Sequence, residues 1–227
     1  MGSVPGAEDT RFARPQARSR PGRPLLLRLS YHAAMASSAL SRWQSDRAKT
    51  IDELLSARAT AGKEGAREKQ LNLALVVRLA AEFQGFAREL HDQASATFAA
   101  WGSAGNTHLA DVLRERMREG RQLDHGNAQP GSLGSDFGRL GFQLWPALAK
   151  RNIASAAHQD TLDRLNRARN AIVHDNETDL ETLEHEGYPI TNTTLETWRS
   201  DLDSLAGTLD TEVAERLGTL FGQSAPW

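Results

Sequence analysis

The sequence has no cysteine, few aromatic residues and no long apolar run. The absence of cysteine excludes disulfide bonds, thiolate nucleophiles and cysteine-ligated zinc or iron–sulfur sites. No stretch approaches the roughly 18–20 apolar residues that span a bilayer, so we expect a cytoplasmic protein without a membrane partner. The formal net charge is only −2. Contact with nucleic acid would therefore depend on a local basic patch.

The composition favours helices over sheets. Alanine and leucine are abundant, and straight-chain side chains lose little rotamer freedom in a helix. Hydrophobic residues make up 39% and charged residues 25% of the 227 positions, which is enough for one ordinary core. We therefore expect an all-α, up-and-down bundle of about five main helices.

The first 34 residues differ from the rest because they combine prolines, glycines and arginines, which oppose regular structure. We expect a disordered Arg- and Pro-rich tail over residues 1–34, with an arm that contacts RNA as the alternative. A helical domain over residues 35–222 and a short C-terminal tail over residues 223–227 should follow. The run Leu25-Leu26-Leu27 is too short for a secretory signal, and Met35 is a second candidate for the true start.

Apolar residues that recur at three- and four-residue steps predict the main helices. The clearest pattern predicts a long helix over roughly residues 67–101. A third helix should follow Asn106, with Leu109, Val112, Leu113 and Met117 on its apolar face. The other expected helices cover residues 45–61, 154 to about 173, and a last one from a capping box at 193–196 to Gly222.

Two segments between these helices are expected to be irregular. Residues 120–136 contain several glycines and Pro130 and therefore predict a loop. Residues 137–148 should form one or two short helical turns, with Pro146 in a first turn. The acidic stretch 175–186 has leucine where a calcium loop needs glycine, which favours a solvated surface segment.

The helix expected at 154–173 has a charged residue on its apolar stripe. Position 169 continues the stripe of Leu162 and Leu165, yet it is Arg169. An unpaired buried charge is very costly, so this guanidinium must be paired or reach a solvent cleft.

Asn170 and His174 lie four residues apart and share one face of that helix. Arg169 and His174 are separated by about 140° around an ideal helix. Both can serve one site only if the helix ends or distorts near His174, or if a second surface meets it there. Asp175 and Asn176 are the candidate helix stop.

The segment 169–174 resembles the HEPN signature, in which an arginine and a polar residue are followed, after a short spacer, by histidine. Two further segments are similar to bacterial HEPN proteins of the RiboL-PSP type. They are residues 82–86 (Glu-Phe-Gln-Gly-Phe) with Leu90-His91, and residues 134–141 (Gly-Ser-Asp-Phe-Gly-Arg-Leu-Gly) with Trp145. The resemblance covers roughly residues 40–222.

The resemblance implies a HEPN-like bundle that commonly dimerises through the motif helices, and metal-independent RNA cleavage in many members. His174 would be the general acid or base, since an ordinary histidine titrates near about 6.5. Arg169 would clamp the scissile phosphate and Asn170 would orient it. Such proteins often act as toxins or in anti-phage defence, so an antitoxin protein is a further expected partner. No cofactor and no metal is implied.

Two supporting residues and two other hypotheses complete the expectations. Glu82 is a candidate ion-pair partner of Arg169, and His91 a candidate lining residue of the same cleft. The alternatives are a non-catalytic HEPN module that binds RNA, nucleotide or a protein, and a structural interaction domain. In the structural case Arg169 snorkels to solvent or pairs with a carboxylate, and His174 caps the C-terminus of its helix. A local RNA surface would have to come from Arg114, Arg116, Arg118 and Arg121, near Arg151.

Overall fold

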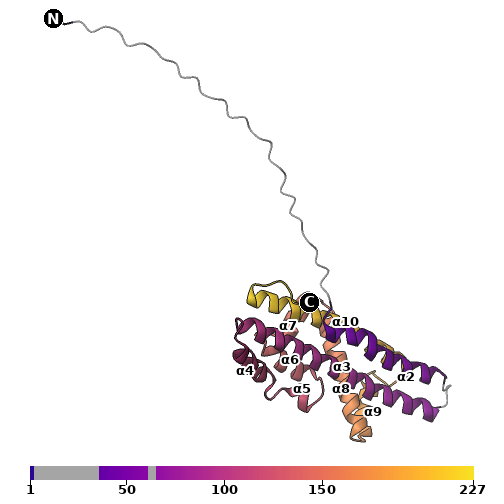
Figure 1. The fold of residues 1–227 in the computed structure, drawn as a ribbon. Helices are drawn as coiled ribbons and strands as arrows, with labels where there is room; N and C mark the ends of the chain where they lie inside the picture. Colours follow the sequence, from indigo (N-terminus) through magenta and orange to yellow (C-terminus); the bar gives the residue numbers. More distant parts are fainter. Residues whose placement is uncertain (3–35, 61–64) are drawn as a thin grey trace. The chain divides into compact units, whose positions relative to one another are not determined.

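The computed structural model describes residues 1–2, 36–60 and 65–227. The expected Arg- and Pro-rich tail, apart from its first two residues, and Met35 lie outside this set. From residue 36 onward the described chain belongs to one compact unit of helices and short connections, without a β-strand in that part (Figure 1). The predicted all-α bundle is confirmed.

The helices follow one another with short connections. In chain order they are α1 (Ser38–Arg42), a π-helical turn η1 (Trp43–Arg47), α2 (Ala48–Thr60), α3 (Gly65–Gly102), α4 (Thr107–Arg118), α5 (Gln122–His125), α6 (Pro130–Gly138), α7 (Leu144–Arg151), α8 (Ser155–Val173), α9 (Glu177–His185) and α10 (Asn192–Phe221). The predicted helices at 67–101 and 154–173 are confirmed as α3 and α8. The first predicted helix begins earlier than expected, at Ser38.

The long helix α3 lies at the centre of the bundle and packs against α1, α2, α4, α8 and α10. Its apolar stripe is fully buried at Phe83, Phe86 and Leu90. The Trp43 ring meets the edge of Phe83 with the ring centroids 5.7 Å apart. Each such buried side chain contributes about 1.5–3 kcal/mol to folding, so the stripe fixes which face of α3 turns inward.

Residues 120–136 are not the predicted loop, because they form α5 and most of α6. The buried Asp136 carboxylate accepts hydrogen bonds from the backbone N–H groups of Gln122 (2.9 Å) and Leu123 (2.8 Å). It therefore stabilises the start of α5 from a distance in sequence, as an N-cap residue does locally. Pro130 occupies the first turn of α6, where its missing N–H costs nothing.

The acidic stretch also contains a helix that the sequence pattern did not predict. Asn176 caps α9 by accepting the N–H of Asp179 (3.3 Å), and the buried Leu183 anchors the helix to the bundle. The start of α10 also differs from the prediction. Its cap is Thr191 rather than a capping box at 193–196, because the Thr191 hydroxyl accepts the N–H of Thr194. Gly222 ends α10 with φ 63°, as predicted.

The apolar face of α4 is less buried than its pattern predicts. Leu109 is 41% and Val112 44% exposed, and none of the residues of α4, all of which are described, is buried. Leu113 and Met117 are half-buried. Two of the four residues predicted on the apolar face, Leu109 and Val112, are therefore exposed, and α4 packs chiefly against α3.

The C-terminal residues 223–227 lie against the bundle, where Trp227 packs on the core. A Cβ atom on Gly218 would come within 2.9 Å of the Gln223 carbonyl oxygen and 3.1 Å of the Ala225 nitrogen. Glycine at this position therefore allows the last residues to approach α10. Among the helices that the structure describes, none is both long and apolar enough to cross a membrane.

Candidate functional site

Helix α8 ends at the point where the sequence pattern requires it to end. Its last residue is Val173, and His174 follows as the C-cap with its N–H bonded to the Asn170 carbonyl (3.0 Å). Asp175 has φ 54°, and the N–H of Asn176 reaches the Ala171 carbonyl (2.8 Å). These bonds close the helix as a Schellman-type end does. The predicted stop at Asp175 and Asn176 is confirmed, and His174 is released from the helical path.

Arg169 is half-buried, and its Nη1 donates a hydrogen bond to Asn170 Oδ1 (3.2 Å). Within the described part of the chain, no carboxylate lies within 4.0 Å of its guanidinium, whereas the neighbouring Arg164 and Arg167 pair with Asp160 and Glu186. The ion pair that the structural interpretation allows for Arg169 is therefore absent among these residues, whereas a snorkelling Arg169 and His174 as the C-cap both agree with the structure. Most of the five N–H donors of the guanidinium stay available to a ligand.

Asn170 is held in place by a residue that lies far away in the sequence. Its Oδ1 accepts a hydrogen bond from Asn127 Nδ2 (2.5 Å), in the connection between α5 and α6. The same connection binds α8 one turn earlier, where Asn166 Nδ2 donates to the Ala128 carbonyl (3.1 Å). Because Asn170 accepts through its oxygen, its own Nδ2 points elsewhere, and no described residue accepts from it. Asn170 therefore offers a free amide donor beside Arg169.

His174 is exposed, and its ring forms no hydrogen bond to the residues that the structure covers. Together, one end of α8 presents a guanidinium, an amide and an imidazole. The first two can only donate from their free atoms, and a histidine ring can donate or accept. This donor set suits an anion such as a phosphate, with a group nearby that can transfer a proton.

Glu82 does not form the expected ion pair with Arg169. Its buried carboxylate binds Arg47 Nη1 (2.5 Å) and also Arg78, one turn earlier on α3. Gly85 makes this possible, because a Cβ atom there would collide with the Arg47 guanidinium. The carboxylate is thus already shared by two arginines, so the expectation for Glu82 is wrong. The segment 82–86 serves to hold η1 against α3.

His91 is fully buried, so it does not line a cleft with the motif residues as expected. Its Nε2 donates to the Asp136 carbonyl (3.1 Å), while Nδ1 faces Arg121 Nη1 and Ser95 Oγ, both at 3.3 Å. Since arginine can only donate, Nδ1 must accept, which fixes a neutral ring with the proton on Nε2. Burial, and then the positive charge of Arg121, lower the pKa of His91 below its ordinary value.

The arginines expected to form a local RNA surface are each engaged with carboxylates. Arg121 is only 3% exposed and binds Asp92 and Asp124. The other four arginines also form ion pairs. Arg114 pairs with Asp111, Arg116 with Glu119, Arg118 with Asp92, and Arg151 with both Glu212 and Glu215. Paired arginines attract phosphates weakly, so this group does not form the expected basic patch.

Asn127 is the functional-site residue that sequence reasoning missed. It lies 43 residues before its partner Asn170, in a stretch expected to be a loop. No local pattern marks an asparagine that fixes another amide across the bundle.

Comparisons of the chain with protein-family models, with curated proteins and with solved structures gave no match.

Proposed function

We propose that this protein is a metal-independent endoribonuclease of the HEPN type that uses Arg169, Asn170 and His174. The observation that supports this most strongly is Arg169, a half-buried guanidinium without a carboxylate partner in the described residues, next to an asparagine held in a fixed orientation. A cation left without its own anion in the protein is ready to bind one from a substrate.

In the proposed reaction the 2′-hydroxyl of the ribose attacks the adjacent phosphorus. His174 takes the hydroxyl proton, the bond from O2′ to phosphorus forms, and the bond from phosphorus to O5′ breaks, which leaves a 2′,3′-cyclic phosphate. Arg169 binds the phosphate oxygens as their charge grows, and the Asn170 amide orients the same group. A protonated imidazole gives the leaving O5′ its proton. DNA lacks the 2′-hydroxyl and is not a substrate.

A homodimer through the motif helix would supply this second imidazole from the His174 of the partner subunit. Val173, next to His174, supports the dimer because it is 50% exposed at the end of α8, and an interface would cover it. A role as a toxin or in anti-phage defence, with an antitoxin protein as partner, rests on the HEPN resemblance.

The test is cleavage of a mixed RNA pool in the presence of EDTA. We expect His174→Ala and Arg169→Ala to lower the rate about 100-fold or more, as the loss of a general acid or base commonly does. His185→Ala and Arg67→Ala are the matched controls, since both residues are exposed and lie outside the motif. Equal cleavage by wild type and His174→Ala, or none by the wild type, would refute the proposal.

A HEPN module that binds RNA without cleaving it is the second candidate. The exposure of His174 favours it, because a catalytic base is normally oriented by a hydrogen bond from a third group. Under this alternative the wild type binds a short RNA in a filter assay and leaves it intact. Arg169→Ala then weakens the binding, while Arg67→Ala does not.

A further inference from the structure

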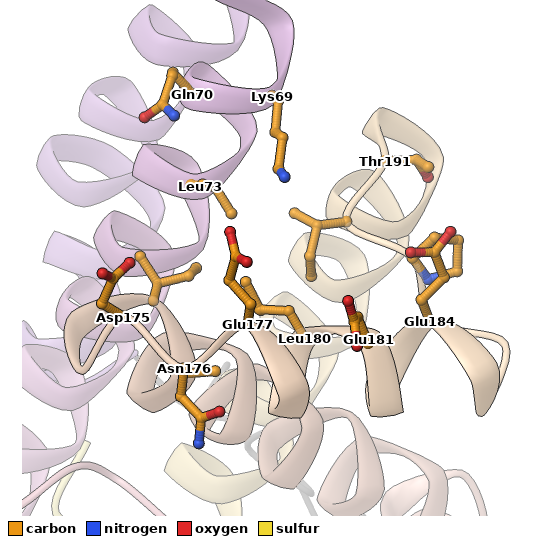
Figure 2. Close-up of a pocket in the computed structure, with 14 residues that line it drawn as sticks. Lys69, Gln70, Leu73, Asp175, Asn176, Glu177, Leu180, Glu181, Glu184 and Thr191 are labelled. Carbon is orange, nitrogen blue, oxygen red and sulfur yellow. The ribbon is translucent and has the colours of Figure 1, made fainter. Parts of the chain in front are cut away.

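Two adjoining clefts form one groove beside the C-terminal end of α8. The first, of about 550 Å³, lies between α3, α9 and residues 189–191, and the second, of about 710 Å³, runs between α2 and α3. They share Gln70, Leu73, Ile172 and Asp175. We name the combined feature the α3–α9 groove, and Figure 2 shows its first part. Arg169, Asn170 and His174 line neither cleft.

The floor of the groove is apolar and only partly covered by the protein itself. Six aliphatic side chains from four helices and one connection line it, and each is half-buried: Leu54, Leu73, Val77, Ile172, Leu180 and Ile190. Each keeps part of its apolar surface in water, which is a cost that a second apolar surface would remove. A partner with an apolar face would cover these six side chains.

The rim of the groove is acidic. Asp175, Glu177, Glu181 and Glu184 are exposed, and no basic group of the described residues lies within 4.0 Å of their carboxylates. Lys69 enters from α3, opposite Glu177 (Figure 2). Arg78, at the far end, is bound to Glu82. Four carboxylates against one free ammonium leave a net charge of −3.

Some acidic residues elsewhere on the surface are paired with arginines, unlike these four carboxylates. Glu186, just after α9, binds Arg167, and Asp203 on α10 binds Arg199. The rim thus keeps its negative charge for a cationic partner, and it repels phosphates. RNA is therefore disfavoured as the occupant of this groove.

We propose that the α3–α9 groove binds a basic amphipathic helix of a partner protein. The lining residues follow α3 from Lys69 to Ala81, a rise of about 18 Å, which corresponds to roughly three helical turns. A helix of this length presents apolar residues at i, i+3 or i+4, and i+7 to the floor, and its lysines and arginines reach the rim. The inference does not depend on the proposed RNA cleavage, because the two sites use different side chains.

The experiment is a selection of displayed helical peptides of about 14 residues on the full-length protein. Each enriched peptide is then synthesised with a fluorescent label and titrated by anisotropy. The groove variant is Glu177→Gln, Glu181→Gln and Glu184→Gln combined. A matched control removes three exposed carboxylates elsewhere that also have no basic group of the described residues within 4.0 Å, with Glu115→Gln, Asp163→Asn and Glu196→Gln. A control peptide has the same composition in rearranged order, so it keeps the positive charge but lacks the apolar helix face. Comparing the two peptides shows whether binding needs that face or only the charge.

We expect enriched peptides that are basic and carry apolar residues at helical spacing. The groove variant should bind them about tenfold or more weakly, and added salt should weaken binding further. The control variant should bind as the wild type does, and the rearranged peptide should lose about tenfold. The proposal is overturned if no peptide is enriched, if enriched peptides are not basic, or if the groove variant or the rearranged peptide binds equally well.

Discussion

The buried histidine of α3 predicts a specific loss of stability in acid. His91 is neutral in the folded protein, and its pKa lies below the ordinary value because of burial and the charge of Arg121. The unfolded chain therefore binds a proton at this residue at a pH where the folded protein does not. The resulting stability is complete above the ordinary pKa and is lost as the pH falls below it.

The size of the effect follows from linkage. If His91 stays neutral in the fold, lowering the pH from 7.5 to 5.5 passes one unit below the ordinary histidine pKa of about 6.5, and the free energy of unfolding falls by about 1.4 kcal/mol. For a chain of this size the midpoint of thermal unfolding falls by about 3–6 °C. Protonation would also place a positive ring against the Arg121 guanidinium, 3.3 Å away.

The assay compares urea unfolding of the wild type and His91→Gln at both pH values. Glutamine offers an N–H for the Asp136 carbonyl and an oxygen for Arg121, but it does not titrate. The wild type should therefore lose about 1.4 kcal/mol more than the variant on acidification. The contributions of all other titrating groups to the free energy of unfolding are the same in both proteins and therefore cancel in this difference. An equal loss in both proteins would refute the neutral, buried state of His91.

Three further predictions concern the motif, the α5 cap and the C-terminal contact. Arg169→Lys should lower RNA cleavage about tenfold or more while the circular dichroism stays unchanged, because lysine lacks the planar fork; an unchanged rate would contradict the clamp. Asp136→Asn should destabilise the protein by about 1–3 kcal/mol in urea unfolding, since one of the N–H groups of Gln122 and Leu123 loses its acceptor. A change below about 0.5 kcal/mol would argue against this cap. Gly207→Ala should stabilise α10 by about 0.5–1 kcal/mol, because nothing lies within 4 Å of the added methyl group. Gly218→Ala in the same helix should have the opposite sign, because its methyl group meets the Gln223 backbone, and equal effects of the two substitutions would contradict that contact.

The long helices could be predicted from sequence because their signals are local. The buried apolar stripe of α3 runs from Leu75 to Ala99, about seven turns. The end of α8 is marked by the residues that form it, Asp175 and Asn176. Helix α5 could not be found in this way. It is four residues long, and the carboxylate that caps it belongs to Asp136, on the next helix.

The candidate site was predictable in its residues but not in their partners. The apolar stripe of α8 identified Arg169 as a charged residue at an apolar position. In the structure this arginine has no carboxylate partner among the described residues. The same pattern could not tell that Glu82 binds Arg47 and Arg78, or that His91 points into the core. Which side chains form ion pairs or hydrogen bonds with one another depends on which helices pack together, and helix periodicity does not predict that packing.

The hydrogen bond from Asn127 to Asn170 has a consequence for the entropy of binding. An exposed asparagine amide rotates freely and must be immobilised when a ligand arrives, at a cost of about 0.5–1.5 kcal/mol. The side-chain amide of Asn170 is already fixed before a ligand binds, because Asn127 donates a hydrogen bond to it. The α5–α6 connection thus pre-organises a donor that it does not itself provide, and an isolated α8 peptide would have the same three motif residues without this advantage.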